Sequence, residues 1–259
     1  MISIQIIDQT SLIAFWLIFS RILPIAMQLP LFDNVSVPVM VKVLMSILIS
    51  YAFYPTVVGE VYRDIHAVGV ESFWYLTFFY TVTGLAIGYF VKALMNIFIS
   101  AGSMITQQIG FGAVRYFDPT TSSQIGPFEK MISLTLLVMI LSSGAIFPMF
   151  KGIVASFSSI HIYDLGKLAA STEFFTRMFK GIFMASLMLA GPMIFINMLI
   201  YSVLGVIART VPQMNIIMVS FAVNIGVGLL VFFSISDEFF RIAFKVYTEK
   251  LGEWFQFIV

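Results

Sequence analysis

The sequence predicts an all-helical protein embedded in a membrane, and its composition and the spacing of its charges carry this prediction. Hydrophobic residues make up 60% of the 259 residues, charged residues make up 10%, and the mean hydropathy is +1.01. Soluble domains contain about one charged residue in four. The charges are also bunched, and the neutral stretches between them reach the length of about 20 residues that a helix needs to cross a bilayer. These stretches lie between Glu71 and Lys92, Lys92 and Arg115, Lys180 and Arg209, and Arg209 and Asp237.

The composition excludes several classes of function. A net charge of +1 leaves no basic stripe to neutralise phosphates, so we expect no nucleic-acid partner. The absence of cysteine excludes disulfides, thiolate metal sites and thiol catalysis. The histidines His66 and His161 lie far apart without carboxylates at ligand spacing, and we expect both to be loop residues. No phosphate-binding loop or nucleophile elbow occurs, so we expect no enzyme, no cofactor and no metal site.

The first half of the chain predicts three helices. Residues 12–31 form an apolar entry helix, bent by Pro24, and its amino end lacks the cations of a cleaved signal peptide. Residues 39–58 form a second helix, and the polar cluster from Glu60 to Glu71 predicts a connecting loop. Between Glu71 and Arg115 the neutral sequence is too long for one bilayer crossing, yet no turn cluster divides it. We therefore expect one long helix that leaves the membrane plane.

The second half predicts a broken helix and then a hairpin. Residues 131–150 form a fourth helix, which Pro148 and Lys151 interrupt. Residues 181–208 and 214–236 are two neutral helices joined by a tight tip at residues 209–213. From Asp237 onward apolar and charged residues alternate at helical spacing, which predicts an amphipathic helix that lies on another surface.

Two cations inside apolar runs are candidate functional residues. Arg21 and Lys92 would cost about 2.5–3.5 kcal/mol each in hydrocarbon. We expect each side chain to reach an interface or to pair with a carboxylate of a neighbouring subunit, and a transport role is the alternative. No acidic residue lies at the centre of a predicted helix to relay protons, which disfavours an ion-coupled transporter.

The segment 109–123 is too polar for hydrocarbon and too apolar for bare solvent. Gly110 and Gly112 allow the chain to turn, while Phe111, Tyr116 and Phe117 need a surface on which to pack. The alternatives are a seal in a pore and an ordinary loop whose aromatic residues dock on their own chain.

Several motifs, taken in order, resemble the FliR family of export-gate subunits and its injectisome counterpart SctT. The pattern Gly205, Arg209, Pro212-Gln213, Asn215, followed by Gly226 and Gly228, is moderately specific. The full set also contains Phe19-Ser20-Arg21-Ile22-Leu23-Pro24, Pro30, Pro38, Gly84-Leu85-Ala86-Ile87-Gly88, Ala101-Gly102, Gln107-Gln108-Ile109-Gly110 and Asp118-Pro119. Together they cover nearly the whole chain. Two departures are Thr83, where the family pattern has an acidic residue, and Ala145, near which it has a histidine.

The resemblance implies a subunit of the export gate of the flagellar type III secretion apparatus, in the basal body at the bacterial inner membrane. Five FliP-like and four FliQ-like chains would complete a closed helical pore for unfolded secreted proteins, with an FlhB-like switch protein at its cytoplasmic entrance. Residues 1–180 would be FliP-like, residues 181–236 a FliQ-like hairpin and residues 237–259 the amphipathic helix.

Within that assembly the resemblance implies roles for two segments. The segment 109–123 would be the pore plug, and its implied members are Ile109, Gly110, Phe111, Gly112, Arg115, Tyr116 and Phe117. The hairpin tip, with Arg209, Pro212, Gln213 and Asn215, would face the cytoplasmic entrance. Two rivals from other classes are a small-molecule secondary transporter, for which we find no inverted repeat, and a membrane scaffold without a pore.

Overall fold

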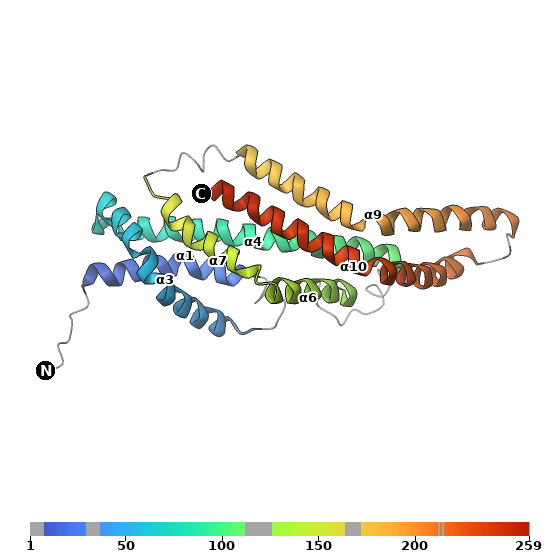
Figure 1. The fold of residues 1–259 in the computed structure, drawn as a ribbon, viewed down its shortest axis with the longest axis horizontal. Helices are drawn as coiled ribbons and strands as arrows, with labels where there is room; N and C mark the ends of the chain where they lie inside the picture. Colours follow the sequence, from blue (N-terminus) through green and yellow to red (C-terminus); the bar gives the residue numbers. More distant parts are fainter. Residues whose placement is uncertain are drawn as a thin grey trace. The chain divides into compact units, whose positions relative to one another are not determined.

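The computed structural model describes residues 8–29, 37–111, 126–163, 172–211, 213 and 215–258, and these contain no strand. The predicted all-α class is confirmed (Figure 1). The helices are α1 (Gln9–Gln28), α3 (Val39–Val68), the short 3-10 helix η1 (Val70–Ser72), α4 (Phe73–Ile109), α6 (Pro127–Ser142), α7 (Ile146–Ser159), α9 (Thr172–Thr210) and α10 (Ile216–Ile258).

Five helical segments of the described residues are long and apolar enough to cross a membrane. They are Gln9–Gln28, Val39–Val68, Val70–Ile109, Thr176–Thr210 and Ile216–Trp254, and α6 and α7 together could supply a sixth. The long helix predicted between Glu71 and Arg115 is confirmed, since α4 runs for 37 residues without interruption. At about 1.5 Å per residue, α4 is about 55 Å long and exceeds a hydrocarbon core of about 30 Å.

Two predicted boundaries are wrong. Glu60, Arg63 and Asp64 belong to α3 and not to a loop, because helical spacing allows Glu60 and Arg63 to pair at 2.7 Å on the outside while Asp64 turns inward. The break after the fourth helix lies at Gly144, whose φ of +72° suits glycine, and not at Pro148. Pro148 instead lies in the first turn of α7, where its missing N–H has no helical acceptor to lose.

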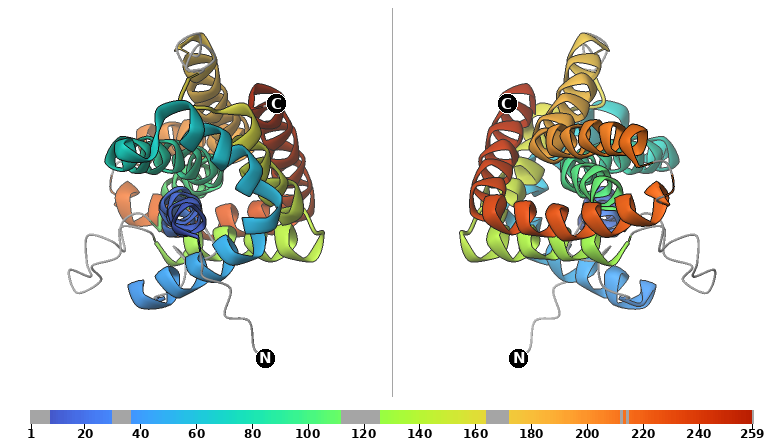
Figure 2. Two further views of the ribbon diagram at one scale, coloured as in Figure 1. Left: turned by 90° about the vertical axis from the view of Figure 1, so that its left-hand side faces the viewer. Right: turned by 90° about the vertical axis from the view of Figure 1, so that its right-hand side faces the viewer.

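The helices form two compact units. The first comprises Met1–Ala93, Gly144–Thr176 and Lys250–Val259, and the second comprises Leu94–Ser143 and Arg177–Glu249. In the first unit α3, which contains Pro55, curves past α1, which is seen end-on in Figure 2. The core of this unit joins α1, α3, the start of α4 and α7 through Leu17, Ile18, Val61, Leu76, Tyr80 and Phe157.

A small-residue motif in α4 lets α1 approach its backbone closely. A methyl group at Gly84 would lie 3.0 Å from the Cα atom of Arg21, and one at Gly88 would lie 3.0 Å from the Cα atom of Ile25. Both distances are tighter than nine in ten real Cβ contacts, whereas a methyl group at Gly59 in α3 would meet nothing within 4 Å. The motif therefore sets the distance between α1 and α4.

The second unit contains the helical hairpin of α9 and α10 and the latter part of α4. Ser186 Oγ in α9 donates to the carbonyl of Ile97 at 3.0 Å, and Tyr247 in α10 lies against the ring of Phe98, with centroids 6.4 Å apart. Helix α10 continues through Asp237 without a break, so the amphipathic segment is an extension of the hairpin helix. Its buried side carries Phe239, Ala243, Tyr247, Leu251 and Trp254.

Candidate functional site

Arg21 is the most deeply buried charge described in the first unit. Its side chain comes from the middle of α1 and is 0% exposed. Nη1 donates to the carbonyl of Ser156 at 3.0 Å and Nη2 donates to the carbonyl of Ile160 at 3.3 Å. The guanidinium also lies 4.4 Å from the ring centroids of both Tyr80 and Phe157. The expectation that the Arg21 side chain reaches an interface is therefore wrong.

The partners of Arg21 follow from helix geometry. The last four carbonyls of an α-helix have no partner within the helix, and they carry the negative end of its dipole. Helix α7 ends at Ser159 and Ile160 is its C-cap, so the carbonyl of Ile160 is an acceptor of this kind. The carbonyl of Ser156 already accepts from the backbone N–H of Ile160 at 3.2 Å and offers its second lone pair to Arg21. An arginine from another helix satisfies them and gains from the dipole. The faces of two aromatic rings complete an environment that accepts a cation without water.

A second set of polar side chains lies beside Arg21. The Tyr80 hydroxyl donates to Oδ2 of Asp64 at 2.7 Å, and Oδ1 of Asp64 lies 3.1 Å from Nδ1 of His161. Asp64 is 1% exposed and His161 is 9% exposed, so both groups are inside the fold. His161 follows the end of α7 and is a loop residue, as expected, but the expectation that it lacks a carboxylate is wrong, because folding brings Asp64 to it across 97 residues of chain. The expectation of a loop residue is wrong for His66, which lies within α3.

Lys92 and His66 differ from this cluster. Lys92 is partly buried in α4, and His66 is exposed on α3. The structure thus places one of the two predicted intramembrane cations, Arg21, in a built polar site. Sequence reasoning missed Asp64 and Tyr80, although the spacing of Glu60, Arg63 and Asp64 already fits a helix with one inward face.

In the second unit, the end of α4 fits closely against α10. Ile109 is 0% exposed, and a methyl group at Gly228 would lie 3.1 Å from its Cγ1 atom. Gly110 ends the helix with a φ of +93°. The ring of Phe111 stacks on that of Phe128 with centroids 6.2 Å apart, which is docking on its own chain. Four other predicted plug residues, Gly112, Arg115, Tyr116 and Phe117, lie outside the described residues.

Side-chain amides cross-link the helices beside this helix end. Asn197 Nδ2 in α9 donates to Oε1 of Gln108, and Asn224 Nδ2 in α10 donates to the hydroxyl of Tyr201 at 3.1 Å. Asn197 and Asn224 are 7% and 4% exposed. Interhelical hydrogen bonds of this kind contribute about 0.6 kcal/mol on average in a membrane protein. The first bond aligns the hairpin with α4, and the second aligns α9 with α10.

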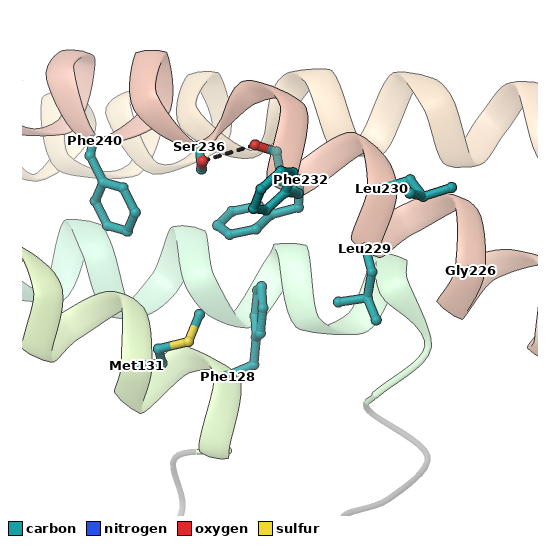
Figure 3. A pocket seen from close by; sticks show the side chains of 9 residues that line it. Phe128, Met131, Gly226, Leu229, Leu230, Phe232, Ser236 and Phe240 are labelled. Carbon is teal, nitrogen blue, oxygen red and sulfur yellow. Dashed lines mark hydrogen bonds between the residues drawn. The ribbon is translucent and has the colours of Figure 1, made fainter.

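An apolar groove of about 710 Å³ runs along α10 beside the start of α6 (Figure 3). Phe128 and Met131 of α6 line one side, and Leu229, Phe232 and Phe240 of α10 line the other. The rings of Phe128 and Phe232 meet edge to face with centroids 4.9 Å apart. The lining offers contact to apolar groups and no charged partner.

The described residues of the predicted hairpin tip lie at the surface. Arg209 lies in the last turn of α9, and both it and Gln213 are exposed. Asn215 precedes α10, and its Oδ1 accepts from the backbone N–H of Met218 at 3.4 Å, which is the position of a helix N-cap. Pro212 lies outside the described residues. Exposed apolar side chains flank the tip, with Val206, Ile217 and Met218 at 67%, 80% and 71%.

These features define a class of protein: an all-helical membrane protein whose long hairpins expose apolar faces and whose buried polar groups join helix to helix. The family model described as bacterial export proteins, family 1, matches residues 12–249, so the chain belongs to that family.

Individual relatives are similar along most of their length. The flagellar biosynthetic protein FliR of Bacillus subtilis (strain 168) is 25% identical over 91% of this chain and 90% of the relative. The FliR of Escherichia coli (strain K12) is 23% identical over 83% and 80%, respectively. The surface presentation of antigens protein SpaR of Shigella sonnei is 23% identical over 86% and 85%. The resemblance found in the sequence motifs is thereby confirmed.

We expect Arg21→Met to lower the free energy of unfolding by about 1–3 kcal/mol, because the carbonyl of Ile160 loses its donor and Asp64 loses a nearby cation. Methionine nearly preserves the volume, so the loss is polar and not a cavity effect. Thermal unfolding of the detergent-purified protein measures it. Arg241→Met is the control, since Arg241 is 78% exposed and its replacement should change stability by less than about 0.5 kcal/mol. Equal effects of the two substitutions would contradict this role of Arg21.

Proposed function

We propose that this chain is a core export-gate subunit of the flagellar type III secretion apparatus, in the basal body at the bacterial inner membrane. The observation that carries the proposal is the match to the bacterial export family over residues 12–249, which coincides with the helices of membrane-crossing length. In this function the chain forms a closed pore with FliP-like and FliQ-like subunits, and unfolded substrates cross it. The five-to-four stoichiometry and the FlhB-like switch protein belong to the same proposal.

The exposed apolar surface of the hairpin supports a multi-subunit assembly. On α9 and α10 the large side chains Met188, Phe195, Leu230 and Phe233 are 63–81% exposed. Apolar area of this extent has a cost of about 25 cal/mol per Å² in water, so it must be covered by lipid or by neighbouring helices. The exposed glycines Gly205 and Gly226 on the same helices favour helices, because small residues allow close backbone contact. Residues 181–236 are in this proposal the FliQ-like hairpin, and residues 1–180 the FliP-like part.

The start of the proposed plug segment is anchored to neighbouring helices. Ile109 and Phe111 pack on α10 and α6, so the segment that follows starts from a fixed point next to buried amides. A seal that must open requires one firm end and one displaceable end. We propose that Ile109 to Phe111 are the firm end and that residues 112–117 block the lumen until substrate displaces them.

A second candidate is the corresponding subunit of an injectisome. The similarity to SpaR of Shigella sonnei, over 86% of this chain, favours it. The two candidates share the gate mechanism and differ in the secreted proteins, so identifying the exported substrates in the native cell distinguishes them.

A mass measurement of the intact detergent-solubilised complex tests the assembly. We expect the chain to co-purify with two smaller families of membrane subunits in fixed stoichiometry, and to aggregate or degrade when it is expressed alone. A long-lived, monodisperse monomer or homodimer would overturn the gate proposal and favour the transporter.

We expect Arg209→Ala and Gln213→Ala to reduce secretion while the mass of the complex is unchanged. Both residues are exposed hydrogen-bond donors at the end of an apolar hairpin, so their removal affects recognition and not packing. Arg241→Ala, at another exposed arginine, which lies on α10 away from the tip, is the control and should secrete normally. Normal secretion by both variants would show that the tip only connects α9 to α10.

Deleting residues 110–116 should leave the complex assembled and make cells permeable to small ions, because most of the displaceable part of the seal is lost together with Gly110 and Phe111 of its firm end. Ion flux into vesicles that contain the purified complex measures this. A second variant replaces the same seven residues with a flexible Gly/Ser linker, which keeps the length and removes Phe111 and Tyr116, and it should leak as well. An assembled complex that stays tight in both variants excludes the plug.

A further inference from the structure

The surroundings of His161 are unusual for a neutral imidazole. Its Nδ1 atom lies 3.1 Å from Oδ1 of Asp64, and its Nε2 atom lies 3.0 Å from the backbone carbonyl oxygen of Ser158. A carbonyl oxygen can only accept a hydrogen bond. A neutral imidazole carries one N–H, so it can satisfy one of these two contacts and must direct a lone pair at the other acceptor.

The second carboxylate oxygen of Asp64 does not supply the missing proton to His161. Its Oδ2 atom accepts from the hydroxyl of Tyr80 at 2.7 Å, so the carboxyl group already has a donor there. One additional proton between Nδ1 and Oδ1 makes every contact in this set favourable. We propose that Asp64 and His161 form a buried proton-binding site, occupied when His161 Nε2 donates to Ser158 and a proton bridges Nδ1 and Oδ1.

Charged groups of both signs surround His161. Ser158 lies in the last turn of α7, where the helix dipole stabilises a cation. From α3, Asp64 lies in direct contact and Oε2 of Glu60 lies 3.8 Å from Nε2. Two cations oppose a positive charge on His161. The guanidinium of Arg21 is buried. Arg63 acts weakly, because its side chain is 68% exposed and is paired with Glu60. The neutral neighbours are Tyr80, from α4, and Tyr163, whose ring stacks on His161 with centroids 5.1 Å apart.

The site joins two helices, so its occupancy has a structural consequence. With the proton bound, His161 ties the carboxyl end of α7 to Asp64 in the middle of the fold, beside the point where Arg21 holds the same helix end. Without the proton, either the contact with Asp64 or the contact with Ser158 brings a ring nitrogen lone pair against an acceptor oxygen. The end of α7 should then loosen from α3, which makes the site a proton-dependent latch. This inference does not depend on the proposed pore.

The pH dependence of stability tests the site, because the chain titrates sparsely near neutral pH. It has no cysteine and two histidines, and histidine ordinarily releases its proton at about pH 6.5. A proton bound only in the folded state contributes stability that is present at low pH and is lost as the pH rises. We expect the midpoint of thermal unfolding of the purified full-length protein, with its co-purifying subunits, to fall by about 2–4 °C between about pH 6 and about pH 9.

Variants assign the effect to the site. His161→Gln removes the titrating ring and should abolish this fall, and Asp64→Asn should reduce it. His66→Gln is the matched control, since it removes the other histidine, which is exposed on α3, and should keep the wild-type pH dependence. An unchanged pH dependence in His161→Gln, or a wild-type stability that increases with pH over this range, would overturn the proposal.

Hydrogen exchange supplies a readout in the wild-type protein should His161→Gln fail to fold. After correction for the chemical rate, exchange of the amides in residues 158–163 should be about tenfold faster at the higher pH, the loss expected for one charge-assisted hydrogen bond. Peptides from α9 are the internal reference and should show no such change. Equal behaviour of the two regions would show that no proton-linked contact exists at the end of α7.

Discussion

The constraint on which the first unit depends is the burial of Arg21. A guanidinium inside an apolar fold is tolerated only where acceptors replace its water, and the carbonyls of Ser156 and Ile160 at the end of α7 are such acceptors. The ring faces of Tyr80 and Phe157 hold the rest of the group. Because α1 supplies the cation, α7 the carbonyls and α4 a ring, the arrangement of these three helices is specified by one side chain. Gly84 and Gly88 then permit the short distance between α1 and α4.

In the second unit, buried polar groups also join the helices, but these groups are neutral. Asn197, Asn224 and Gln108 form hydrogen bonds between helices, and Gly228 provides room for Ile109. Apolar packing alone selects a register weakly, since lipid offers similar contacts, whereas a polar pair is satisfied in one alignment. Buried polar groups thus determine how these helices pair, and the apolar side chains that remain exposed are available to lipid and to other subunits. This division suits a member of an export family that works within an assembly.

Much of the fold was predictable, because membrane helices leave a strong signal in composition. The single long α4 followed from one isolated Lys92 in a neutral run, and the hairpin followed from two neutral runs around Arg209. The prediction fails where polar residues continue a helix. Glu60 to Asp64 continue α3, since a helix accepts polar residues when one face meets a buried partner. Pro148 does not break the chain into two helices as predicted, because the first turn of a helix tolerates proline.

By itself, the sequence determined the all-helical membrane class, the order of the helices and, through its spaced motifs, the export family that the family match confirms. These properties depend on composition and local spacing, which the chain carries in any conformation. Only the tertiary structure decided that Arg21 closes the end of α7 and that Asp64 meets His161. The first contact joins residues 135 positions apart and the second joins residues 97 positions apart, and no local pattern encodes them. They arise because buried charges and free helix ends must find each other when the helices pack.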